Sequence, residues 1–320
     1  MQTALRWDPK VLEPIYRELY ALEMKNKKDF IPMLYNVTTS NKSMESYAGV
    51  GSEGTMEEWS HSNNQVHYED VDDLWEKIIK NRKFSDGRII ERDFIDDLKL
   101  AEISRRIKSL SGSVYMTQQL QAVEFLNNGF ATTGPNWRGR IDKYMGPDGK
   151  ALFAADHPYS PTNSTDVQSN LGSSPLTIDS WDDTAVAMQE WNDDKGNPLA
   201  VIPDTLIVSP YNARPAFKIA GLPDSDLPKY EPGSNHFDVN MYQGTIKVIV
   251  NPFISAAKRK NWFAADSARL KQFNIWQWRR KIENGTITDF DTEVSKFKAI
   301  GRWAYGFTNY SFIYGHNVQD

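Results

Sequence analysis

The chain has 320 residues, of which 40% are hydrophobic and 25% charged, and its formal net charge at pH 7 is -5. This length suffices for two domains with substantial cores, and the acidic balance disfavours binding to a phosphate backbone, which requires clustered Lys and Arg. The absence of cysteine excludes disulfides, thiolate nucleophiles and sulfur-ligated metals.

The amino terminus lacks the features of a secretory signal. Arg6, Trp7 and Asp8 lie where a signal peptide needs an uninterrupted apolar core. No stretch of the sequence approaches the length that spans a membrane. We therefore expect a protein that is made in the cytoplasm and has no membrane partner.

An amphipathic helix is predicted after Asp8-Pro9, because apolar residues from Val11 to Leu22 recur at helical spacing. From Phe30 to Asn64 the chain is polar and rich in glycine without a sustained period, which indicates an extended arm rather than a compact unit. The polar stretch 62–86 is expected to contribute few side chains to a core.

A long helix is predicted over residues 93–128, which contain no proline. If unbroken, it would span roughly 50 Å. Ser111-Gly112-Ser113 is a candidate kink, and Gly129 is placed to end the helix as a left-handed cap. One face of this helix carries apolar residues four, three and four positions apart, namely Ile103, Ile107, Leu110 and Val114.

Short helices and strands are predicted to alternate after a turn region rich in Gly and Pro. A helix capped by Asp179 or Ser180 should bury Trp181, Ala185 and Met188 on one side. Aromatic residues alternate from Trp303 to Tyr314, with an interruption at residues 308–309, as in a strand with a turn or bulge. The other predicted elements are a helix over 211–220 and strands over 199–202, 205–208, 245–250, 262–264 and 275–278.

No pattern in the sequence indicates a cofactor or a metal. Gly49-x-Gly51-x-x-Gly54 matches the dinucleotide fingerprint, but no buried strand precedes it and no helix former follows it. The five histidines show no zinc-ligand spacing. Asp156-His157 is the one suggestive pair; its two side chains would diverge in a strand, but Pro158 favours a turn here. We therefore expect His157 to be a hydrogen-bonded structural residue.

Two further clusters have a functional and a structural interpretation. The acidic residues Asp70, Asp72 and Asp73, like the Asp96-Asp97 pair, lack the spacing of a calcium loop, so solvated faces and helix starts are expected. Trp276 and Trp278, next to Arg279-Arg280-Lys281, could stack on nucleic acid bases. Alternating Trp residues in a strand favour a core or an interface instead.

A series of short motifs follows in a fixed order along most of the chain. It comprises Tyr47-x-Gly49, Met56-x-Glu58-Trp59, Glu91-Arg92-Asp93, Leu152-Phe153-x-x-Asp156-His157-Pro158, Pro175-Leu176, the helix from Trp181 to Met188, Pro198-Leu199 and Pro203-x-x-Leu206-Ile207-Val208. Taken together, residues 45–320 resemble the Mu-like major head subunits of tailed bacteriophages, which are shell proteins of the Hong Kong 97 type.

The resemblance implies an α+β fold of the Hong Kong 97 type with four parts. These are an amino-terminal arm (1–54), an extended loop (55–92), a peripheral domain built on the long spine helix (93–170 and 285–320), and an axial domain (171–284). The loop is expected to be a hairpin that reaches over a neighbouring subunit.

The implied function is structural, without catalysis or cofactors: a major capsid subunit that forms the pentamers and hexamers of an icosahedral head. The shell would be assembled in the host cytoplasm and would enclose double-stranded DNA without reading its sequence. Whether a portal, scaffold, maturation protease or decoration protein takes part stays open, as does covalent cross-linking. The expected assembly residues are Trp59, Lys77, Lys80, Arg82, Lys83 and Arg92.

Two alternatives remain at this point. An encapsulin-like nanocompartment has the same fold, and a cargo peptide in purified shells would reveal it. A cytoplasmic hydrolase would use His157 with Asp156, and an activity lost in His157→Ala would support it.

Overall fold

The computed structural model describes residues 9–52, 54–56, 58–59, 65–66, 68, 71–97, 99–221, 242–289, 291–292 and 294–319. The chain divides into two compact units. Unit 1 combines the segments up to Glu45, Ile79–Ala122 and Ile275–Gly306. Unit 2 combines Ser46–Ile78, Val123–Asn274 and the segment from Phe307 onward.

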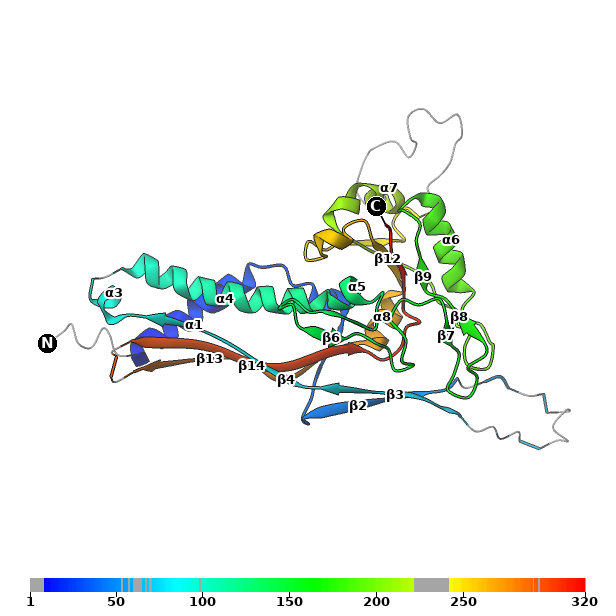
Figure 1. The fold of residues 1–320 in the computed structure, drawn as a ribbon, viewed down its shortest axis with the longest axis horizontal. Coiled ribbons are helices and arrows are strands. Elements are labelled where there is room, and N and C mark those ends of the chain that lie inside the picture. Colours follow the sequence, from blue (N-terminus) through cyan, green and yellow to red (C-terminus); the bar gives the residue numbers. More distant parts are fainter. Residues whose placement is uncertain are drawn as a thin grey trace, which may run out of the picture. The chain divides into compact units, whose positions relative to one another are not determined.

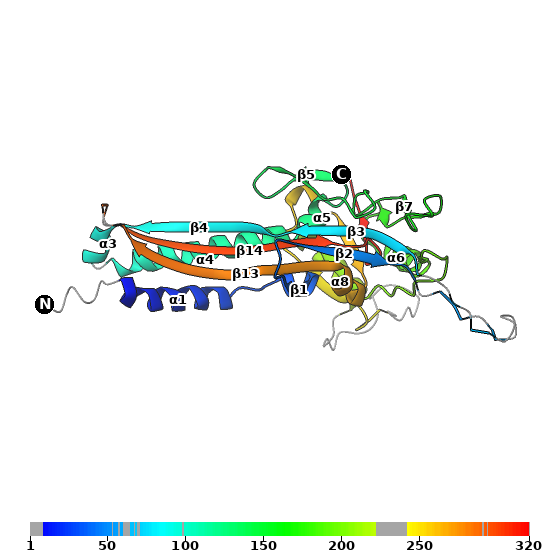
Figure 2. The same ribbon diagram turned by 90° about the horizontal axis from the view of Figure 1, so that it is seen from below.

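Unit 1 consists of a four-stranded sheet and its helices. The strand order is β1 (Asn36–Thr39), β13 (Asn274–Thr288), β14 (Ser295–Phe307) and β4 (Arg82–Ile90). Figures 1 and 2 show the helix α4 lying lengthwise along this sheet with α1 beside it. The helices are α1 (Pro9–Lys25), α2 (Ile31–Leu34), α3 (Arg92–Asp96) and α4 (Leu100–Ala122).

The core of unit 1 lies between α4 and one face of the sheet. In β14 the side chains of Ser295, Phe297 and Ala299 are buried, while the residues between them face the other way. The apolar face predicted for the long helix is confirmed, because its four residues pack against this side of the sheet. The buried cluster contains Ile90, Ile103, Ile107, Leu110, Val114, Phe297 and Ala299.

The long helix is interrupted where the sequence gives no signal. The helix α3 ends at Asp96 and α4 begins at Leu100, and a turn at Val123 separates α4 from α5 (Glu124–Asn128). The 23 residues of α4 therefore span about 35 Å. The candidate kink at residues 111–113 lies within α4, where the Ser113 hydroxyl donates a 2.5 Å hydrogen bond to Asp86. The expected left-handed cap is wrong, since Gly129 has a φ of -64°.

Several side chains of residues 30–40 are part of the core. This corrects the expectation of an extended arm that contributes nothing to a core. Phe30, Ile31, Leu34 and Tyr35 are buried. The hydroxyl of Tyr35 donates to the carbonyl of Ala122 over 3.1 Å, and its ring packs edge-on against Trp276 with centroids 5.6 Å apart. The strand β1 pairs in parallel with β13. The helix and the strand have four residues each, which is too short to show a period.

The stretch 62–86 contributes few side chains to the core, as expected, but its last residues belong to the sheet of unit 1. Ile79 is buried, and the ring of Phe84 stacks on that of Trp303 with centroids 4.2 Å apart. All nine residues of β4 pair with β14. The hairpin is formed instead by β2 (Met44–Val50) and β3 (Asp73–Lys80), which pair as a separate two-stranded sheet.

Unit 2 contains a five-stranded sheet in the order β11 (Lys247–Val250), β10 (Thr205–Val208), β12 (Trp262–Ala265), β15 (Ile313–His316) and β9 (Leu171–Gly172). Two small pairs accompany it, β5 (Thr133–Pro135) with β6 (Ile141–Lys143) and β7 (His157–Pro158) with β8 (Val167–Gln168). Its longer helices are α6 (Ile178–Gln189), α7 (Ala213–Ala220) and α8 (Ser267–Phe273), and short 3₁₀ turns cover Pro210–Asn212 and Ala256–Lys258.

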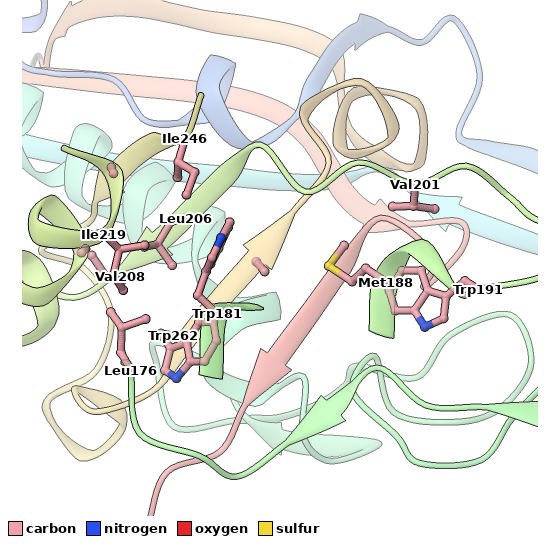
Figure 3. Close-up of a cluster of buried hydrophobic side chains, with 13 residues drawn as sticks. Leu176, Trp181, Met188, Trp191, Val201, Leu206, Val208, Ile219, Ile246 and Trp262 are labelled. Atoms are coloured by element: carbon pink, nitrogen blue, oxygen red, sulfur yellow. The ribbon is translucent and has the colours of Figure 1, made fainter. Parts of the chain in front are cut away.

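The core of unit 2 is rich in tryptophan. Figure 3 shows Trp181 of α6 next to Trp262 of β12, and their ring centroids are 6.4 Å apart. All residues of β10 and β12 are buried, so both strands are covered on both faces. The predicted buried face of α6 is confirmed, because Trp181, Ala185 and Met188 are all buried.

Two local predictions in unit 2 are wrong. The cap of α6 is Thr177, whose hydroxyl accepts from the backbone N–H of Ser180 while the Ser180 hydroxyl accepts from that of Thr177. Residues 199–202 are not a strand, although Val201 is buried.

The aromatic alternation near the end of the chain is confirmed, but its two halves belong to β14 and β15, which lie in different sheets.

A buried histidine joins α6 to the sheet of unit 2. The ring of His316 stacks on Trp262 with centroids 3.9 Å apart, and its Nε2 lies 2.9 Å from Oγ1 of Thr184. Because the Thr184 hydroxyl donates to the carbonyl of Ser180, it accepts from Nε2–H. Protonation would therefore place a hydrogen on Nδ1, which has no partner among the described residues. Burial lowers the pKa of His316 to about 4.

We expect this histidine to make stability depend on pH. In the unfolded chain it binds a proton near pH 6.5, whereas the folded protein resists protonation down to a pKa of about 4. The contribution is thus complete above pH 6.5 and is lost as the pH falls towards 4, by up to about 3 kcal/mol. His316→Phe keeps the stacking and removes the titration, so its unfolding free energy should fall less over this range. Equal slopes for the two proteins in denaturant titrations would contradict this role.

Candidate assembly surface

The hairpin of β2 and β3 exposes large apolar side chains around its connecting segment. Met56 is fully exposed, with a relative accessibility of 100%, Tyr68 is 88% exposed and Trp59 is 57% exposed. Val50, Val66 and Val71 are exposed as well. A group of exposed apolar residues on one segment is typical of a surface that another protein covers.

The base of the hairpin is fixed within unit 2. The backbone N–H of Gly51 donates to the carbonyl of Asp72 over 2.8 Å, and that of Ser52 donates to Oδ1 of Asp194 over 2.8 Å. A Cβ atom on Gly51 would lie 2.7 Å from the Asp194 carboxylate, so glycine permits this close approach. Gly49 lies within β2, where an added Cβ atom would likewise come too close to Leu74. Close approach therefore explains Gly49 and Gly51, two of the three glycines of the Gly49-x-Gly51-x-x-Gly54 motif.

Lys77 is held within the subunit. Its ammonium donates to the carbonyl of Met145 over 2.6 Å and lies 5.5 Å from the ring centroid of Phe307. Burial lowers the pKa of this lysine, and the charge of Asp148 opposes the shift. The side chain therefore anchors β3, and its contribution to assembly stays a prediction.

The other predicted assembly residues lie on exposed positions. Lys80 is the exposed last residue of β3, and Arg92 is the exposed first residue of α3. Arg82 and Lys83 are adjacent in β4, so their side chains point to opposite faces of the four-stranded sheet. Arg82 and Lys83 consequently do not belong to one patch, and the role of the six residues between subunits stays a prediction.

His157 is a buried structural residue. Its Nδ1 lies 2.6 Å from Oδ2 of Asp148 and its Nε2 lies 3.2 Å from the carbonyl oxygen of Leu152. The two ring nitrogens thus each face an oxygen atom of the protein. The ring also stacks on Tyr310, with centroids 3.8 Å apart. The site is closed to solvent, because the His157 and Asp148 side chains are only 1% and 3% exposed.

Asp156 and His157 diverge, and His157–Pro158 form the strand β7, although Pro158 favours a turn in the sequence. The Asp156 carboxylate is 55% exposed and pairs with Lys150, and the hydrogen bond from this lysine lowers the pKa of Asp156. The hydrolase alternative requires these two side chains to act together on a substrate. Since one is buried and the other faces solvent with a different partner, the structure contradicts that mechanism.

We expect His157→Ala to reduce stability. It would leave the Asp148 carboxylate buried without its partner, at a cost of roughly 3–5 kcal/mol, whereas Asp156→Asn at the exposed neighbour should change stability by less than about 0.5 kcal/mol. Thermal unfolding of both variants measures the difference. Equal effects, or a stoichiometric metal released by His157→Ala, would show that the assignment is wrong.

Asp148, the partner of His157, is not predicted from the sequence, because the residues around it fit more than one structure. Asp148 follows Gly146-Pro147, where an aspartate ordinarily indicates a turn. Only the folded chain shows that its carboxylate points inward. Asp194, which holds Ser52, lies in a similar polar turn and gives no stronger signal.

The remaining candidate chemistry is absent from the described part of the chain. Trp276 is buried and packs against Trp303 and Tyr305. The half-buried Trp278 packs against Trp276 and Trp303, so both rings belong to the core side of the sheet. Within the described residues, no group of His, Asp and Glu is placed to hold a metal ion. No described helix has both the length and the apolar character that a bilayer crossing requires.

A family model described as phage capsid protein matches residues 79–315. The chain belongs to this family. As a phage capsid protein it is a structural component of a virion shell, and such shells are built from copies of the same subunit. Among curated proteins, none matches the sequence.

Solved structures share the fold at low sequence identity. The chain is similar to a subunit in the procapsid of bacteriophage JBD30, with 14% identity and a TM-score of 0.53 over 100% of this chain and 77% of that one. It is also similar to a protein of Gordonia phage Cozz, with 13% identity, a TM-score of 0.53 and coverages of 92% and 89%. A virus-like particle from Pyrococcus furiosus gives 11% identity and a TM-score of 0.50, over 95% and 98%. The capsid protein therefore has the predicted α+β fold of the Hong Kong 97 type.

Proposed function

We propose that this capsid protein is the major head subunit of a Mu-like tailed phage, which assembles into pentamers and hexamers around double-stranded DNA in the host cytoplasm. The observation that carries the proposal is the exposed apolar segment of the β2–β3 hairpin, which includes Met56 and Trp59. A subunit that acts alone has no use for such a surface, whereas neighbouring subunits in a shell can cover it.

The two compact units support a division into two functional domains. Unit 1 holds α4 and the four-stranded sheet, and we assign it to the peripheral domain. Unit 2 holds the five-stranded sheet, and we assign residues 171–274 within it to the axial domain around the five-fold and six-fold axes. Residues 123–170 and those from Phe307 onward pack within unit 2, whereas the resemblance to the head subunits implies a peripheral domain that contains them.

Cryo-electron microscopy of the protein expressed alone tests the proposal. We expect closed shells with both five-fold and six-fold capsomers and with unit 2 nearest their axes. Shells formed without other phage proteins would show that a scaffold, portal or protease is dispensable for assembly. Shells that carry a bound cargo peptide would indicate the encapsulin-like alternative, and a protein without any symmetric assembly would contradict the proposal.

A further inference from the structure

A small pocket lies in unit 1 where α1 and α4 meet the four-stranded sheet. Its volume is about 20 Å³. The helix α1 contributes Arg17 and Tyr20 to its lining, α4 contributes Ile107 and Leu110, and β13 contributes residues 284–286. Figure 2 shows α1 running beside β13, the strand that it meets at this pocket.

Two buried polar atoms at this pocket lack a protein partner. They are the hydroxyl of Tyr20 and Oδ1 of Asn284, and neither forms a hydrogen bond with any of the described residues. Both side chains line the same pocket. Since a buried polar atom without a hydrogen bond destabilises the folded state, two such atoms at one pocket require an explanation.

The two atoms have complementary roles in hydrogen bonding. An amide oxygen can only accept, whereas a phenol hydroxyl can donate. Burial raises the pKa of Tyr20 to about 12, so the hydroxyl keeps its proton over the whole neutral range. A molecule that satisfies both atoms must therefore accept from Tyr20 and donate to Asn284.

The size and the charge of the pocket select one kind of molecule. A single water molecule needs roughly 10–15 Å³, so the pocket can hold one and is too small for an organic ligand. The oxygen of Asn284 repels an anion, and the positive charge of Arg17 disfavours a cation. Water is small and neutral, and it both donates and accepts.

We propose that one water molecule is bound in this pocket and bridges Tyr20 of α1 to Asn284 of β13. The Tyr20 hydroxyl donates to the water, and the water donates to Oδ1 of Asn284. This bridge adds a polar contact beside Leu19, which packs against the hydrophobic cluster of unit 1. The inference concerns the folding of unit 1 and does not depend on the proposed function.

The position of the bridge determines what it does for the helix. At the carboxyl end of α1, the ammonium of Lys27 lies 5.3 Å from the ring centroid of Tyr115. The Tyr115 hydroxyl donates to the carbonyl of Lys28, just beyond the helix, over 2.6 Å. Tyr20 lies about two turns earlier, so the water attaches the middle of α1 to the sheet.

A density map of the purified protein, at a resolution that shows ordered waters, tests the site directly. We expect one peak within hydrogen-bond distance of both the Tyr20 hydroxyl and Oδ1 of Asn284. A map without this peak would overturn the proposal. A map in which the two side chains bond each other directly would overturn it as well.

Hydrogen exchange of the α1 backbone amides tests the energetic role of the bridge. Tyr20→Phe removes only the hydroxyl, and Asn284→Leu removes the amide with little change of shape. Each single variant leaves the water and the other side chain with one partner fewer, so we expect exchange in α1 to become roughly fivefold faster. The double variant removes both polar groups, and its exchange should be no faster than that of either single variant.

Tyr68→Phe is the matched control, because it removes a hydroxyl from a tyrosine that is 88% exposed. We expect exchange in α1 to be unchanged in this variant. If the effects of Tyr20→Phe and Asn284→Leu multiply in the double variant, the two side chains act independently and no bridge joins them. If neither single variant changes exchange in α1, the bridge does not hold the helix and the proposal fails.

Discussion

Replacing Ile107 by aspartate is expected to unfold the subunit. Ile107 is 3% exposed and packs in the cluster between α4 and the four-stranded sheet. A carboxylate at this position would be buried without a partner, at a cost of several kcal/mol. Since whole proteins are stable by only about 5–15 kcal/mol, we expect a large fall in melting temperature and little soluble protein.

Met116→Asp is the matched control for this prediction. Met116 lies in the same helix and is 47% exposed, so the same charge remains hydrated there. We expect its melting temperature to stay close to that of the parent in thermal unfolding followed by circular dichroism. A mild effect at Ile107, comparable to that at Met116, would mean that α4 does not pack on the sheet as described.

Removing the connecting segment of the hairpin is expected to abolish assembly and preserve folding. Replacing residues 53–71 by a short Gly/Ser link deletes Met56, Trp59 and Tyr68, which are exposed. The link can close, because the backbone N–H of Gly51 already bonds the carbonyl of Asp72. We therefore expect a parent-like melting temperature and no shells in electron micrographs.

The control is a deletion of residues 62–86, which extends into the folded core. It removes Ile79 and Phe84 and half of the pairing between β4 and β14. We expect this variant to be insoluble or to melt far below the parent. If the shorter deletion also lowers the melting temperature strongly, or if it still builds normal shells, the assignment of the hairpin as an assembly element fails.

Long elements with one buried face were predictable from the sequence. The spacing of Ile103, Ile107, Leu110 and Val114 indicates one helix face over several turns, and all four residues are buried in one cluster. The same rule indicates the buried face of α6, where Trp181, Ala185 and Met188 are buried. In both cases a local geometric rule is sufficient, because no distant residue decides the outcome.

Short or amphipathic strands were not predictable in the same way. In β4, the alternate residues Lys83, Ser85, Gly87 and Ile89 are exposed, so the strand resembles a solvated loop in sequence. Its assignment depends on pairing with β14, more than two hundred residues away. The partner of His157 depends on a turn that brings Asp148 inward. Such contacts are tertiary, and the local sequence contains no equivalent signal.

Sedimentation velocity of the purified protein tests the central claim most directly. If the chain is a capsid subunit whose exposed hairpin is covered by neighbours, it should sediment as large, discrete assemblies at micromolar concentration. The variant without residues 53–71 should sediment as a small folded species under the same conditions. A parent protein that remains strictly monomeric across the micromolar range would contradict the account.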